Sequence, residues 1–290
     1  MGNRDWGMGT GVPLLAREPV VMRGFSLVVL ALVGHGGDEP VEGSPPQDPV
    51  PRYTAAMLAE ASFDLRVRAT IRTQSGGPLR EETIARDARL EVRVTADADT
   101  LRLEAWFDSL VVFREGPEGR IAPDADGLIG GRFRGTLTPD GHYRSTARPF
   151  VPDELVEVTD LGGALHDLLP LLPATALAVG GRWDGGPLRI VRRPDSTSQG
   201  IRLARYRWSR VAFDTTAAFL DDSLRYETRT RHQEEGDLVW HPVHGPLVWH
   251  RVSHIAIEIP AEGPVRRAVR TSVAEDAWAW RRLRVPPPSR

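Results

Sequence analysis

Residues 63–72, FDLRVRATIR, alternate apolar and polar side chains without a break. The apolar members run from Phe63 to Ile71 at every second position, and Asp, Arg or Thr fills the positions between them. A period of two is typical of a β-strand with one buried face and one wet face. The stretch therefore predicts a strand whose arginines point toward solvent.

The same alternation recurs along the chain. It returns in residues 89–94 and 101–105, and then at Ile129, Phe133 and Leu137. A Pro-Asp-Gly turn at 139–141 predicts a hairpin onto residues 142–150. Further strands are expected at 187–193, 200–213, 223–232, 246–259 and 265–283. Because the connections are short and almost free of helix, the pattern favours an antiparallel meander over a parallel sheet.

One segment has helical spacing. Leu161, Leu165, Leu168 and Leu169 fall on one side of a helix that Pro170 would end. We therefore expect a mainly β protein: a large curved antiparallel meander sheet, a half-barrel or open barrel, with this one central helix packed on its apolar face.

The N-terminal region has the features of an export signal. One arginine at 23 precedes the apolar run 25–33, and glycines follow at 34 and 36. The run is too short to span a bilayer, so no transmembrane segment is expected. We predict an upstream extension and signal peptide over 1–36, a disordered proline-rich linker over 37–52, and a single β domain over 53–290. The mature protein is expected in the periplasm or outside the cell.

Composition excludes several kinds of site. The chain has no cysteine, which removes disulfides, zinc–thiolate centres and thiol nucleophiles. All 37 basic residues are arginine, and the net charge of −2 gives no general attraction to nucleic acid. No catalytic motif is present, so we expect no cofactor and regard an enzyme as the less favoured class. The oligomeric state stays open.

Histidines concentrate in one part of the chain. Five of the eight lie between His232 and His254, and the sequence Leu-Val-Trp-His occurs there twice, ending at His241 and at His250. A metal site made from His241, His244 and His250 is one interpretation, and a metal-dependent hydrolase would use it. Because the spacing of these residues does not converge on a regular strand, we expect no metal and favour a hairpin with solvent-facing histidines.

Two short segments carry a resemblance. Residues 169–173, LPLLP, and 180–183, GGRW, resemble a feature of uncharacterised exported bacterial β-sheet proteins. The expected architecture is also similar to that of envelope lipoprotein and lipid carriers, which have a curved sheet and a covering helix. This resemblance implies a fold and a location, and it assigns no catalytic residue.

Three classes of function follow. An exported carrier would bind an apolar small molecule or lipid on the inner face of the sheet, beneath the helix. The expected lining residues are Phe63, Leu65, Val67, Leu101, Leu103, Phe133, Leu165 and Leu169. A structural or partner-binding envelope protein would fill that face with side chains instead, and a hydrolase would use the histidine cluster. A continuous apolar cavity between helix and sheet would distinguish the first class from the second.

Overall fold

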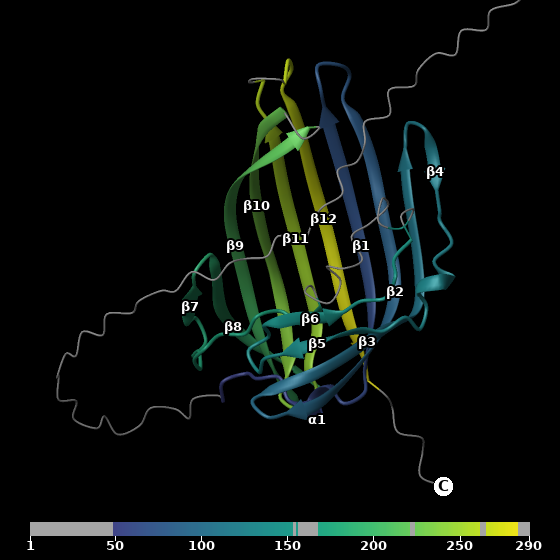
Figure 1. Cartoon of the computed structure of the whole chain (residues 1–290). Helices are drawn as coiled ribbons and strands as arrows, with labels where there is room; N and C mark the ends of the chain where they lie inside the picture. The colour runs from purple at the N-terminus through teal and green to yellow at the C-terminus, as the bar shows by residue number, and fades with distance from the viewer. Residues whose placement is uncertain (1–48, 153–154, 156–167, 221–223, 262–264, 284–290) are drawn as a thin grey trace, which may run out of the picture. The chain divides into compact units, whose positions relative to one another are not determined.

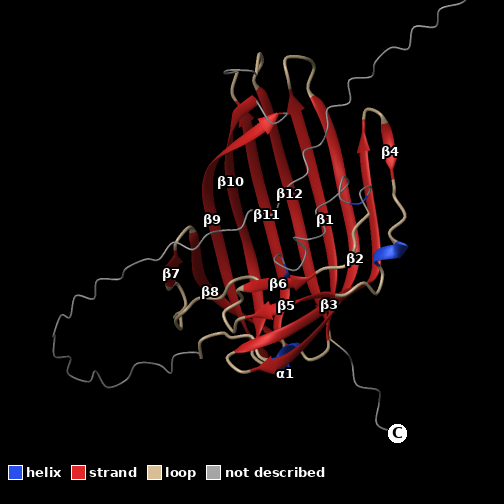
Figure 2. Ribbon diagram, in the orientation of Figure 1, coloured by secondary structure: helices blue, strands red, loops and turns tan. Residues whose placement is uncertain are grey.

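The computed structural model describes residues 49–152, 155, 168–220, 224–261 and 265–283. Strands make up most of this part (Figure 1, Figure 2). The strands are β1 (Ala61–Gln74), β2 (Arg80–Asp97), β3 (Thr100–Gly116), β4 (Gly119–Ile121), β5 (Phe133–Leu137), β6 (Tyr143–Ala147), β7 (Arg182–Gly185), β8 (Leu188–Ser198), β9 (Ile201–Leu220), β10 (Leu224–His241), β11 (Gly245–Ile259) and β12 (Val269–Arg282). The helices are α1 (Ala55–Leu58) and the 3₁₀ turn η1 (Asp126–Leu128).

All twelve strands belong to one open antiparallel sheet. Its order is β6-β5-β3-β2-β1-β12-β11-β10-β9-β8-β7, with β4 pairing β3 outside this path. Neighbours in the sheet are neighbours in sequence except where β5 pairs β3, past β4, and where β1 pairs β12. The prediction of one large antiparallel sheet is therefore confirmed, and the pairing of β1 with β12 joins its two halves.

The pairing registers set two distinct faces. We call the face that carries Phe63, Leu65 and Val67 the inner face and the opposite one the outer face. One row of aligned residues on the inner face reads Tyr206, Leu238, Trp249, Ala279, Leu65, Ala88 and Leu110 across seven strands. All seven are buried. Aspartates, glutamates and arginines line the outer face and pair across the strands, so one face is apolar here and the other is wet.

The core lies at one end of the sheet. The register of β2 and β3 shifts between Arg89 and Leu90, and from there β3, β5 and β6 turn across the ends of the central strands (Figure 1). Phe133 of β5 and Trp240 of β10 thereby share one buried cluster. Tyr53 closes it: the ring meets Trp240 edge-on at 5.4 Å, and its backbone N–H bonds the Pro139 carbonyl at 2.8 Å.

The predicted central helix is not supported. Most of residues 161–169, Leu165 included, lies outside the described residues; Leu168 and Leu169 are described, and both are buried in the core. The only α-helix lying wholly within the described ranges is the single turn α1. The proposed signal peptide and most of the linker also lie outside these ranges. In the described part of the chain, no helix is long and apolar enough to cross a membrane.

Candidate functional site

A hollow of about 600 Å³ lies where the N-terminal segment crosses the inner face of β8, β9 and β10. We call it the end hollow. Tyr206 and Trp240 form its aromatic wall, and Met57, Val50 and Val243 add aliphatic surface. Its size falls in the range of small-molecule sites, which are mostly apolar with a few polar groups.

Local structure keeps the aromatic wall in place. Tyr206 and Trp240 project from the same face because the register pairs Tyr206 with Leu238, two residues from Trp240. The Tyr53 ring packs against Trp240 from the side of the core. Burial raises the pKa of the Tyr53 hydroxyl well above its usual value, and that hydroxyl donates to the Pro170 carbonyl at 2.9 Å. A neutral, hydrogen-bonded phenol thus supports one wall of the hollow.

The polar part of the end hollow is positively charged. Arg52, Arg192 and Arg202 line it, and its described lining contains no Asp or Glu. Arg192 is buried, pairs with Asp195 at 2.5 Å and lies 5.0 Å from the Tyr206 ring centroid. Arg202 pairs with the same carboxylate.

Arg52 has no carboxylate among its described partners. It donates to the Pro173 and Ala174 carbonyls at 2.9 and 2.8 Å. Three arginine side chains therefore line the end hollow beside its apolar wall, and the described lining contributes no carboxylate.

A second unusual feature is a set of charged side chains on the inner face, above the apolar core. We call Arg210, His232, Glu234, Arg251 and Glu275 the inner charged cluster. Arg251 donates to Glu234 at 3.1 Å and also pairs with Glu275. His232 lies 3.1 Å from Glu234 and 3.0 Å from the Ser253 hydroxyl.

The electrostatics of this cluster keep Glu234 ionised. Burial alone would raise the pKa of Glu234, but the hydrogen bond from His232 and the charges of His232, Arg251 and Arg210 outweigh it and lower that pKa. The positive and negative side chains of the cluster pair with one another. The cluster is therefore a structural network of ion pairs rather than an acid–base centre. Alternation could have revealed it, because Arg251 lies two residues from Trp249 and four from Ile255, on the same face as both.

The structure places the predicted apolar lining residues in the packed core. Phe63, Leu65, Val67, Leu101, Leu103, Phe133 and Leu169 are all at most 8% exposed. None of them lines the end hollow. Sequence reasoning missed the residues that do line it, because they come from three strands, a turn and the N-terminal segment, and no periodic pattern associates segments so far apart in sequence.

The histidines do not converge. The His241 and His244 rings lie 4.5 Å apart, whereas His250 stacks on Trp278 at 3.9 Å and pairs with Asp276 at 2.9 Å. The described residues contain no group of three or more His, Cys, Asp or Glu that could hold a metal ion.

His241 has a structural role in the β10–β11 turn. Its Nδ1 accepts the backbone N–H groups of Val243 and His244 at 3.0 and 3.1 Å. Burial, with the nearby His244 and Arg281, lowers its pKa. A neutral imidazole with an unprotonated Nδ1 therefore caps this turn.

Comparison with known proteins gives no family. No protein-family model matches the chain, and no curated protein sequence matches it.

Three solved structures have low similarity. A lipovitellin structure matches at 9% identity with a TM-score of 0.42, covering 79% of this chain. This chain spans 26% of that lipovitellin chain. The attachment invasion locus protein Ail of Yersinia pestis matches at 8% identity and a TM-score of 0.17, covering 77% of this chain and 99% of that one. A DUF1329 family protein from Desulfovibrio piger matches at 11% identity and a TM-score of 0.15, covering 79% of this chain and 88% of that one. At these scores, none of the three carries an argument about function.

Proposed function

We propose that this protein acts after export as a binding protein for an apolar small molecule or lipid that carries an anionic group. The end hollow is the observation that supports this proposal. Its aromatic wall would bury the apolar part of the ligand, and the arginines beside it would face the anionic group.

The proposed site lies at a different place from the lining residues that were expected from sequence. The apolar residues of the inner face fill the core with one another, whereas the hollow opens at the end of the same face, under residues 49–57. A ligand there would contact Tyr206 and Trp240 without displacing core side chains. This arrangement needs no covering helix over the sheet.

The test uses the full chain and long-chain fatty acids brominated along the chain. Bromine quenches tryptophan fluorescence on contact, and Trp240 lies in the wall of the hollow. We expect saturable quenching, and about tenfold or greater weakening in Ala204→Phe, because the added ring occupies the hollow. The matched control is Val111→Phe, at a position 61% exposed on the outer face. It should leave the affinity unchanged.

The head group is tested separately. An alcohol of the same chain length should bind more weakly than the acid, and Arg202→Gln should remove that difference while the surface variant Arg207→Gln keeps it. Absence of saturable binding, or equal affinities in Ala204→Phe and the parent protein, would contradict the proposal. Either result would favour the alternative of a structural or partner-binding protein with a filled core.

A further inference from the structure

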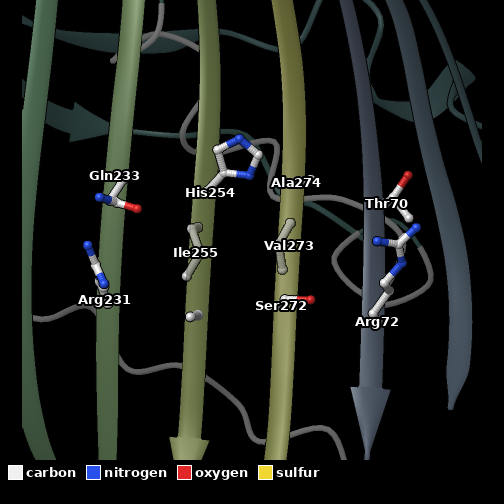
Figure 3. Close-up of a pocket in the computed structure, with 10 residues that line it drawn as sticks. Thr70, Arg72, Arg231, Gln233, His254, Ile255, Ser272, Val273 and Ala274 are labelled. Carbon is white, nitrogen blue, oxygen red and sulfur yellow. The ribbon is translucent and has the colours of Figure 1, made fainter.

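The outer face carries a second hollowed region that the apolar-ligand function does not use. Two adjoining hollows, of about 330 and 630 Å³, lie over the central strands β10, β11, β12 and β1. Both are lined by Arg72, Arg231, Ala256 and Ser272, so they form one elongated depression that we call the outer groove. Figure 3 shows the residues that line its smaller part.

The pairing register explains the shape of the groove. Arg231, Ala256, Ser272 and Arg72 are aligned in one row across the four strands. Short side chains on the two middle strands form the floor, and long side chains on the flanking strands form the rims. The two arginines are three strand spacings apart, on the order of 14 Å between backbones.

The next row supplies further hydrogen-bonding side chains. Gln233, His254, Ala274 and Thr70 are aligned in the same way, two residues further along each strand. In Figure 3, the side chains of Gln233, His254 and Thr70 lie around the floor formed by the middle strands. These side chains can donate to and accept from hydroxyl groups.

Arg231 differs from the arginines around it. The other outer-face arginines of these four strands whose side chains are described all pair with a carboxylate. They are Arg66, Arg68, Arg72, Arg229, Arg270 and Arg282. For Arg231 the described residues provide only the ring of Phe213, 5.5 Å from its guanidinium carbon. Phe213 is itself 72% exposed. Asp214 and Glu258 also line the groove, but neither pairs with Arg231. Arg231 is thus a cation without an ion pair among the described residues, and it is held against an aromatic ring.

From this arrangement we propose that the outer groove binds an acidic oligosaccharide. Arg231 pairs with a sugar carboxylate, and Gln233, His254 and Ser272 bond the hydroxyl groups. The apolar face of a sugar ring packs on Ala256 and on Phe213 at the rim. An elongated depression with several hydrogen-bonding side chains suits a chain of hydroxylated rings better than it suits a compact anion such as phosphate. Because most outer-face arginines are already paired, the face lacks the broad positive field that nucleic acid or an anionic membrane needs.

The test is isothermal titration of the full chain at low ionic strength with trimers of galacturonate and of mannuronate. The fully methyl-esterified galacturonate trimer keeps the rings and hydroxyl groups but removes the charge. We expect at least one uronate trimer to bind, and its affinity to fall as salt rises. The ester and inorganic phosphate should bind about tenfold or more weakly than the acid trimer.

Two variants and one control locate the site. Arg231→Gln removes the free cation, and Ala256→Trp fills the floor without changing charge; each should weaken trimer binding about tenfold or more. Arg207→Gln on the same face removes an arginine that is paired with Glu235 and lies outside the groove, and it should have no effect. The proposal is overturned if neither uronate trimer binds, if the ester binds as well as the acid, or if phosphate binds equally tightly. Brominated fatty acid binding is measured in parallel, so failure of this site is distinguishable from failure of the end hollow.

Discussion

The indole rings of Trp208 and Trp249 stack across Gly236, with centroids 6.2 Å apart and planes inclined by 13°. The register places Gly236 between them, opposite Trp208 on β9 and Arg251 on β11. A Cβ at this glycine would meet the Trp208 ring at 2.9 Å and would also press on the His250 carbonyl. The glycine therefore creates the space in which the two rings meet.

Gly236→Ala should destabilise the fold by about 1–3 kcal/mol, the range for overpacking a filled core. Urea unfolding followed by tryptophan fluorescence would measure the loss. Gly77→Ala is the matched control, because a Cβ at Gly77 would have nothing within 4 Å. Equal effects of the two changes would show that the Trp208 contact does not restrict residue 236.

Arg251→Met should cost about 3–5 kcal/mol, because it leaves Glu234 and Glu275 in the inner charged cluster without their shared cation. Arg207→Met removes an exposed pair with Glu235 and should cost no more than about 1 kcal/mol. Equilibrium unfolding of both variants tests the contrast. A small loss of stability in Arg251→Met would mean that the cluster is more hydrated than its burial indicates.

His241 should make stability depend on pH in the mildly acidic range. Its folded pKa is lowered, so the unfolded chain takes up a proton near pH 6.5 while the folded chain resists. This contribution is complete above about pH 6.5 and is lost as the pH falls through the lower folded pKa. His241→Asn keeps an acceptor for the turn but does not titrate.

The free energies of unfolding at pH 7.5 and at pH 5.5 should therefore differ less in His241→Asn than in the parent protein. His254→Asn, at an exposed outer-face position, serves as the control and should keep the parent difference. An unchanged pH dependence in His241→Asn would remove His241 as its source.

Leu103→Ala tests whether the inner face is a filled core. Leu103 has no exposed surface, and truncating a buried leucine costs about 2–5 kcal/mol when the site cannot collapse. Leu79→Ala, at a position 57% exposed, should cost little. If Leu103→Ala were equally mild, the predicted lining residues would surround adjustable space, as a carrier with its ligand on this part of the sheet requires.

Export gives the remaining prediction, which depends on the sequence alone. A charge, an apolar run and small residues over 22–36 predict cleavage near residues 34–37. Mass spectrometry of the protein purified from its own cells should find the N-terminus there. An intact N-terminus on protein recovered from the cytoplasm would contradict this prediction.

Alternation along the chain was sufficient to predict most of the strands and their antiparallel order. The reason is geometric: successive side chains of a strand point to opposite faces, so a strand between core and water must alternate. Residues 63–72 became the middle of β1, and the Pro-Asp-Gly turn joins β5 to β6 as expected. The short strands β4 and β7 were missed, because three or four residues offer no pattern.

Tertiary structure alone decided where the candidate sites lie. Pairing of β1 with β12 brings Arg72 into one row with Arg231, which is 159 positions away in sequence, so no local pattern could associate them. Likewise, the wall of the end hollow combines residues 49–57 with β8, β9 and β10. By itself, the sequence determined which side chains each strand turns to the core, because that depends on neighbours two positions apart. Which of these side chains meet was determined by strand register and by the crossing of distant segments. Both depend on contacts between residues far apart in sequence, which alternation does not encode.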